Sequence, residues 1–204
     1  MILVDDSPRQ PASPVQTVRE FAQSLSAGAS ASERRMVVAI YRNGEQMQEG
    51  PDLNILLNMP AESVEQLELM TQPVGPLVCT ALDEALALLD EAQAAREEAA
   101  DRLDSGDQPA AMSGIQRMVL NWQAIQKSLS LSAEALEIEL DSLNIDDRSF
   151  VDFVQEMKHR LTELKNAMDL RDHVMVTDLL RYELSETLDT WRPIIQTLRN
   201  RLTS

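Results

Sequence analysis

Apolar residues recur at steps of three or four from residue 173 to residue 202, near the end of the chain. The positions are Val176, Leu180, Leu184, Leu188, Trp191, Ile195, Leu198 and Leu202. On a helix, this spacing gathers the apolar side chains into one stripe, which must be buried against other helices. Pro193 lies inside the stripe and lacks the backbone N–H that would bond the carbonyl of Asp189. We therefore expect a bend between Asp189 and Pro193.

The same periodicity predicts three more helices upstream. They cover residues 77–103, 109–131 and 148–168. The first is rich in alanine, which lets a neighbouring helix approach closely, although Arg96 interrupts its apolar stripe. Acidic turns at residues 104–107 and 169–172 join the four helices into two hairpins. Residues 77–204 are therefore predicted to form a closed, all-α four-helix bundle.

The two predicted hairpins share one apolar pattern. A Trp is followed by apolar residues three and seven positions later, at Trp122 in the first hairpin and at Trp191 in the second. Either an old duplication or convergence on helix packing explains this likeness. Between the hairpins, residues 132–147 combine alternating apolar positions with strong helix formers, so their conformation stays open.

Shorter segments with turns between them predict a separate small domain over residues 1–72. Strands are expected near residues 2–4, 36–41, 45–48 and 64–71, and helices near residues 17–28 and 51–57. Thr17 and Glu20 have the spacing of a capping box, and Asn43-Gly44 is a strong two-residue hairpin signal. Residues 73–76 hold two prolines and a glycine, so they are predicted to be a linker.

This order of strands and helices resembles a β-grasp (ubiquitin-like) domain. The predicted fold class is therefore α+β, a small β-grasp-like domain followed by the helical bundle. Modifiers and sulfur carriers of that fold end in a free Gly-Gly, but this chain has only Gly75 and then continues. Plant-type iron–sulfur versions need four cysteines, and residues 1–72 contain none. The resemblance therefore implies a binding role.

Composition narrows the classes of partner. The formal net charge of −16 disfavours nucleic acids and anionic membranes, and it fits either a basic protein partner or simple solubility. The single cysteine, Cys79, excludes an internal disulfide and is consistent with a reducing compartment. No apolar run is long enough to span a membrane, and the first residues lack the pattern of a signal peptide. We expect a cytoplasmic protein.

Candidate chemistry is sparse. Glu156 and His159 form a Glu-x-x-His pair, but a di-iron bundle needs a second pair, and Leu170 stands where His173 would need its glutamate. Cys79 lies near the predicted start of a helix, where a thiolate is stabilised, yet no base is marked as its partner. Phosphate-binding glycine loops and serine-nucleophile motifs are also missing. We predict no catalytic, cofactor or metal site.

The expected function is that of a non-enzymatic adaptor or chaperone-like protein that binds a protein partner along the helical bundle. The residues expected at the binding surface are Trp191, Tyr182, Met175 and Trp122. Methionine adapts to varied partners and an exposed Trp is a common anchor, whereas the alternative for both types is the core. In broad plan the second half is similar to bacterial secretion and flagellar chaperones and adaptors. Two alternatives remain, a metal-binding or enzymatic bundle using Glu156, His159 and His173, and a structural homodimer.

Overall fold

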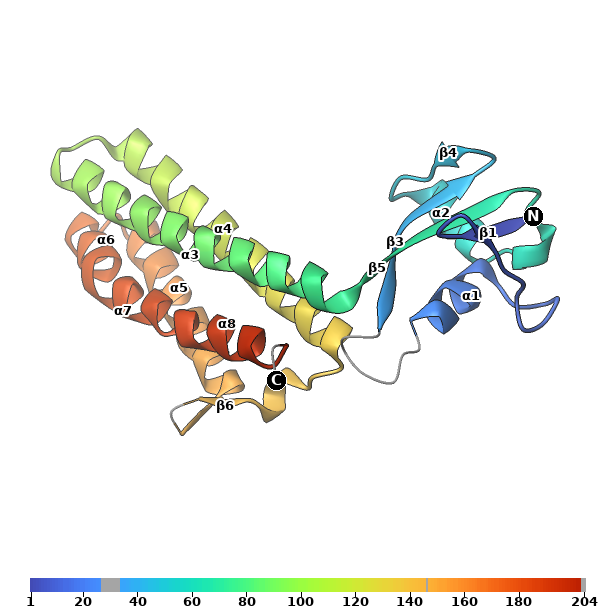
Figure 1. Cartoon of the computed structure of the whole chain (residues 1–204). Helices are drawn as coiled ribbons and strands as arrows, with labels where there is room; N and C mark the ends of the chain where they lie inside the picture. Colours follow the sequence, from blue (N-terminus) through green and yellow to red (C-terminus); the bar gives the residue numbers. More distant parts are fainter. Residues whose placement is uncertain (27–33, 146, 203–204) are drawn as a thin grey trace. The chain divides into compact units, whose positions relative to one another are not determined.

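A computed structural model describes residues 1–26, 34–145 and 147–202. The chain divides into two compact units, Met1–Leu77 and Val78–Ser204. The first contains a mixed β-sheet and the second is mostly helical, so the fold class is α+β, as the sequence predicts (Figure 1). No helix in the described ranges is long and apolar enough to cross a membrane.

The N-terminal unit is built on a five-stranded sheet with the order β2-β1-β5-β3-β4. Its strands are β1 (Ile2–Val4), β2 (Ser7–Pro8), β3 (Arg35–Arg42), β4 (Glu45–Gln46) and β5 (Leu67–Pro73). β1 and β5 run parallel, and the other neighbours are antiparallel. Three helical segments complete the unit, namely α1 (Val18–Leu25), α2 (Pro51–Leu57) and η1 (Ala61–Ser63). Phe21 of α1 and Leu56 of α2 share one apolar core with Leu67 and Leu69 of β5.

Local signals account for several of these elements. The capping box at the start of α1 is confirmed, because the Glu20 N–H donates to Thr17 Oγ1 at 3.2 Å and Glu20 Oε2 accepts from the Thr17 N–H. The hairpin turn between β3 and β4 is also confirmed, since Asn43 and Gly44 both have positive φ. The expected end of the α1 helix, at residue 28, lies outside the described residues.

The predicted linker at residues 73–76 is wrong. Pro73 ends β5, and α3 (Val74–Asp104) begins at the next residue, three positions earlier than the expected start at residue 77. Pro76 falls within the first turn of α3, where the backbone N–H has no intrahelical acceptor and its absence costs little. The division between the two units falls after Leu77.

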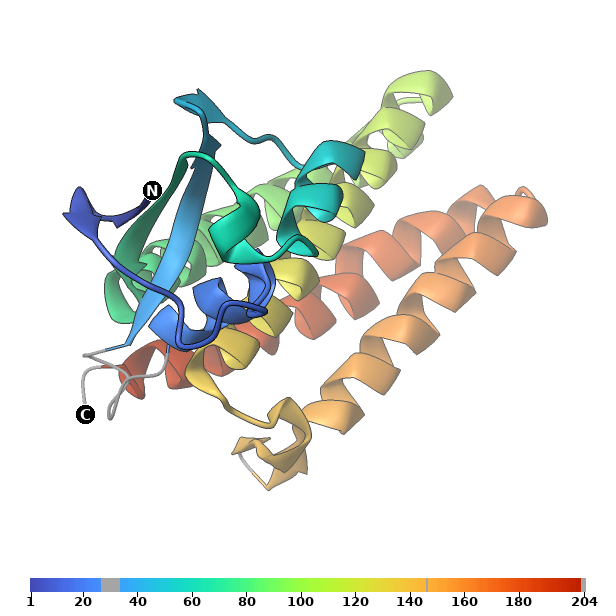
Figure 2. The same ribbon diagram turned by 90° about the vertical axis from the view of Figure 1, so that its right-hand side faces the viewer.

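The helical unit has four arms arranged as two hairpins, and Figure 2 shows them in a view turned by 90° from that of Figure 1. The first hairpin joins α3 to α4 (Gln108–Leu136). The second joins α5 (Phe150–Asp169) to a segmented fourth arm, α6 (His173–Asp178), η3 (Leu179–Glu183), α7 (Leu184–Asp189) and α8 (Trp191–Asn200). The conformation of residues 132–147, which the sequence left open, is partly helical, because α4 continues to Leu136. A 3₁₀ turn, η2 (Leu140–Ser142), and two short paired strands, β6 (Asn144–Ile145) and β7 (Arg148–Ser149), follow it.

Small residues bring α3 and α4 close together. Ala95 and Ala99 of α3 are fully buried, and a Cβ added to Gly114 of α4 would lie 2.9 Å from the Cβ of Ala99. The core of the helical unit also contains an aromatic pair. Trp122 and Trp191 pack edge to face with ring centroids 4.3 Å apart.

The fourth arm is not one regular helix. Its middle segment, η3, is a π-helical turn in place of the regular α-helix expected there. Where we expect the bend, the helix is interrupted at Thr190, because α7 ends at Asp189 and α8 begins at Trp191. Pro193 is therefore the third residue of α8, where its missing N–H is tolerated.

Candidate functional site

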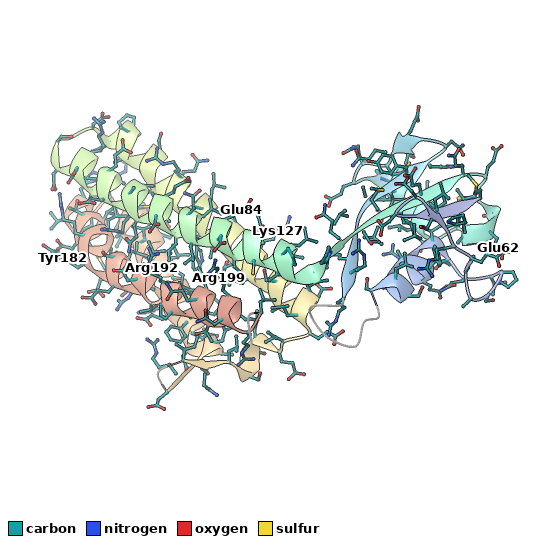
Figure 3. The ribbon with its side chains drawn as sticks, in the orientation of Figure 1. Glu62, Glu84, Lys127, Tyr182, Arg192 and Arg199 are labelled. Carbon is teal, nitrogen blue, oxygen red and sulfur yellow. The ribbon has the colours of Figure 1, made fainter. Side chains whose placement is uncertain are left out.

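A ladder of ion pairs that apolar periodicity does not predict joins α3 to the fourth arm. Asp83 pairs with Arg199 at 2.7 Å, Asp90 pairs with Arg192, and Asp101 pairs with Arg181 at 2.8 Å. Figure 3 labels Arg192 and Arg199 on the fourth arm, beside α3. The signal was present, because the three aspartates are spaced by 7 and 11 residues and the three arginines repeat these intervals in reverse. Two antiparallel helices bring such mirrored charges face to face.

Arg96 also joins α3 to the fourth arm. Among the described residues, it is the one buried cationic side chain that does so. Its side chain is 8% exposed, and its Nη1 donates to the carbonyl oxygen of Leu180 at 2.5 Å and to that of Arg181 at 3.4 Å. Both carbonyls belong to the π-turn η3. Burial lowers the pKa of Arg96 below its ordinary value, and the nearby carboxylates of Glu97 and Asp189 oppose this shift. Arg96 thus binds the π-turn from the inside and holds it on α3.

On its outer side, the π-turn lines a groove of about 430 Å³ together with α5 and α6. The lining residues are Arg160, Glu163, Met175, Asp178, Leu179, Tyr182 and Glu183. We call this surface the α5–η3 groove. Leu179 is buried, whereas Met175 is 40% exposed and Tyr182 is 62% exposed. Two of the four residues expected at the binding surface therefore lie together, on one groove.

Charges on the α5–η3 groove are organised around Arg160. Its guanidinium pairs with Glu163 at 2.9 Å and with Glu183 at 2.7 Å, which links α5 to η3. The hydrogen bond to Glu163 is the main cause that raises the pKa of Arg160, against the opposing effect of burial. Asp178, at the end of α6, is exposed and forms no ion pair within the described part of the chain. The groove therefore combines an apolar surface with an excess of negative charge.

The other two expected binding residues, Trp122 and Trp191, are core residues instead. Both rings are buried, and Phe150 and Phe153 pack edge to face on Trp191. The reason is their position on the apolar stripes of α4 and the fourth arm, which face each other across the bundle. Neither ring reaches the surface, so neither is an anchor for a partner.

The residues of the metal-site alternative do not converge. Glu156 pairs with Arg148 at 2.5 Å, and His159 lies 3.5 Å from Glu163 on the same helix. His173 Nε2 lies 3.1 Å from Gln108 Nε2 at the far end of the bundle. Within residues 1–26, 34–145 and 147–202, no group of three His, Cys, Asp or Glu side chains is arranged to hold a metal ion. Cys79 is half-buried and is the sixth residue of α3.

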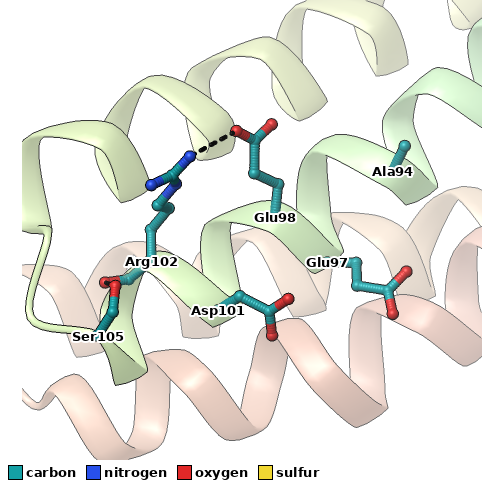
Figure 4. Close-up of a pocket in the computed structure, with 6 residues that line it drawn as sticks. All are labelled: Ala94, Glu97, Glu98, Asp101, Arg102 and Ser105. Carbon is teal, nitrogen blue, oxygen red and sulfur yellow. Dashed lines mark hydrogen bonds and ion pairs between the residues drawn. The ribbon is translucent and has the colours of Figure 1, made fainter.

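A second hollow, of about 440 Å³, lies along α3 (Figure 4). Its lining is Ala94, Glu97, Glu98, Asp101, Arg102 and Ser105. Glu98 lies 3.8 Å from Arg102 and 2.5 Å from Arg117, and Asp101 pairs with Arg181. This hollow has no large apolar side chain, and several of its charges already stabilise the bundle. The α5–η3 groove is the better candidate for a binding site.

Comparison with known proteins assigns the helical part to a family. Residues 80–194, more than half of the chain, match the family described as a domain of unknown function (DUF8042). The matched range runs from α3 into the first turn of α8 and includes every residue of the α5–η3 groove. No curated protein and no solved structure matches the chain.

Proposed function

The chain belongs to this family through its helical unit, and we propose that the unit is a non-enzymatic protein–protein interaction module. Its binding surface is the α5–η3 groove. The observation that carries the proposal is the exposure of Tyr182 and Met175 on a groove whose floor, Leu179, is apolar. Aromatic residues and methionine are enriched at protein interfaces, and an apolar centre with a charged rim is the usual composition of such a surface.

Two further apolar side chains in this part of the chain are exposed. Leu170, in the turn between α5 and α6, is 78% exposed, and Val174 in the first turn of α6 is 73% exposed. Both lie within five residues of Met175 in the sequence. Exposed apolar residues are normal when scattered singly, but several near one groove are typical of an interaction site.

We further propose that the N-terminal unit is a β-grasp domain and a second docking surface of an adaptor or chaperone-like protein. Support comes from the strand order β2-β1-β5-β3-β4 with β1 parallel to β5. Met36 and Val38 are exposed on β3 and offer apolar contact area on this unit. We place the protein in the cytoplasm, which agrees with its single cysteine.

Quantitative affinity enrichment tests the proposed surface. Wild-type protein and a Met175→Ala/Tyr182→Ala variant are each used as bait in an extract of the source cells. A Leu120→Ala variant is the matched control, since Leu120 is an exposed apolar residue on α4, outside the groove. We expect the wild-type and Leu120→Ala baits to enrich the same partner proteins, and the Met175→Ala/Tyr182→Ala bait to lose them. Equal enrichment by all three baits would contradict the proposal.

Sedimentation of the same proteins over a concentration series tests the homodimer alternative. The groove proposal expects a monomer whose sedimentation is independent of concentration and of the double substitution. A dimer that dissociates when Met175 and Tyr182 are replaced would assign the groove to self-association instead.

A further inference from the structure

We propose that the occupant of the α5–η3 groove is a cationic amphipathic helix of a partner protein. This inference rests on the proposed function and adds the chemistry of the ligand. Three properties of the groove lead to it, namely its charge, its apolar floor and its position between two helices.

The charge of the groove selects a cationic partner. Three carboxylates, Glu163, Asp178 and Glu183, surround one guanidinium, that of Arg160. Arg160 is shared between Glu163 and Glu183, and Asp178 has no ion pair with a described residue. A lysine or arginine of a partner therefore gains attraction at Asp178 without breaking an existing pair.

The same charge argues against a second copy of this chain. Each copy carries a net charge of −16, so two copies repel each other at any surface that lacks a basic counterpart. The one guanidinium in the groove is already neutralised by its two glutamates. A partner of opposite charge is favoured in both affinity and rate of association.

The shape of the groove selects a helix. It lies along the seam between α5 and the segment formed by α6 and η3, two antiparallel arms of one hairpin. An amphipathic helix placed on such a seam inserts its apolar side chains between the two ridges. A volume of about 430 Å³ has room for a few side chains but not for a whole helix. The partner helix would therefore lie across the mouth, with apolar residues on Leu179 and between Met175 and Tyr182.

Binding of designed peptides to the full chain tests this inference by fluorescence anisotropy. The probe is a labelled amphipathic helical peptide of leucine and lysine. A peptide of the same composition with a scrambled order lacks the apolar face, and a peptide of leucine and glutamate reverses the charge. We expect the first peptide to bind at least about tenfold more tightly than the other two, which corresponds to about 1.4 kcal/mol.

Substitutions then locate the binding. We expect Asp178→Asn to weaken the cationic amphipathic peptide about three- to fivefold, and Tyr182→Ala to weaken it about tenfold. The matched controls are Glu84→Gln, which removes one exposed charge from α3, and Leu120→Ala, and both should leave affinity unchanged. Equal weakening by Asp178→Asn and Glu84→Gln would overturn the inference, because the attraction would then be a property of the whole acidic chain. Tight binding of the scrambled or acidic peptide would overturn it as well.

Failure here is distinguishable from failure of the proposed function. If the cationic peptide does not bind in the groove but the Met175→Ala/Tyr182→Ala bait still loses its enriched proteins, the groove is a binding site for a partner of other chemistry. If the groove substitutions change neither measurement, both proposals fail.

Discussion

Replacing Arg96 by alanine is expected to destabilise the helical unit by about 2–4 kcal/mol. The Arg96 guanidinium is buried and donates to two carbonyls of the π-turn, the closer one at 2.5 Å on Leu180. A hydrogen bond to a charged group contributes about 1.5–3 kcal/mol, and a carbonyl left buried without a donor costs about 1–3 kcal/mol. Relief of the desolvation cost of the buried charge offsets part of this loss.

An Arg96→Met variant separates the contribution of side-chain packing from that of the hydrogen bonds. Methionine fills most of the volume of the arginine stem, so packing is kept while the donors are lost. We expect this variant to be destabilised by about 1–2 kcal/mol, less than the alanine variant, because only the unpaired carbonyls remain as a cost. The control is Arg102→Ala on the same helix, where the exposed side chain lies 3.8 Å from Glu98 and 3.9 Å from Asp107. Exposed pairs of this kind contribute less than about 1 kcal/mol.

The assay is urea unfolding followed by intrinsic Trp fluorescence. Both tryptophans of the chain, Trp122 and Trp191, lie buried in the helical unit, so the signal reports on that unit alone. The order of stability should be wild type and Arg102→Ala, then Arg96→Met, then Arg96→Ala. If Arg96→Ala is as stable as Arg102→Ala, the buried contact with the π-turn is not what holds the fourth arm, and the reasoning is refuted.

Three further predictions follow from single contacts. Gly114→Ala should destabilise the helical unit by about 1–3 kcal/mol in the same fluorescence assay, because the new methyl group would meet Ala99 at 2.9 Å; a gain in stability from the better helix former would contradict this. Ser149→Ala removes the capping box of α5 and should cost about 1 kcal/mol, and no measurable loss would count against the cap. Hydrogen bonds from the side chain and backbone of Thr71 lower the pKa of Asp5 below 3.8, so their contribution to stability is full above about pH 5 and is lost as the pH falls through the lowered pKa. Asp5→Asn should therefore flatten the acid dependence of the N-terminal unit in calorimetry, and an unchanged acid profile would refute the assignment.

Local sequence signals predicted those elements that follow from residue spacing and turn or cap preferences. The Thr17 cap, the Asn43-Gly44 turn and the four helical arms follow from periodicity and from backbone preferences. The prediction of a linker at residues 73–76 was wrong, because a proline breaks the interior of a helix but not its first turn. Burial of Trp122 and Trp191 depends on which apolar helix faces pack against each other. The spacing within one helix does not show which other helix it packs against.

The spacing of apolar residues in the fourth arm also indicates the π-turn, although we predicted a regular α-helix there. Val176, Leu180, Leu184 and Leu188 are separated by three successive steps of four residues. At 3.6 residues per turn, each such step overshoots a full turn by about 40°, so the stripe drifts around a regular α-helix. A wider turn at Leu179–Glu183 takes up this drift and keeps all four residues facing the core. The mirrored spacing of aspartates and arginines was a second, unused signal, and it identifies α3 as the neighbour of the fourth arm.

Site-specific photo-crosslinking in the source cells tests the central claim, that the α5–η3 groove binds a partner protein, most directly. The photoreactive p-benzoylphenylalanine replaces Tyr182 in one version of the protein and Leu120 in another, both at exposed positions of the helical unit. The account predicts a discrete, higher-mass adduct with one partner from position 182 and none from position 120. No adduct at position 182, or the same adducts from both positions, would contradict it.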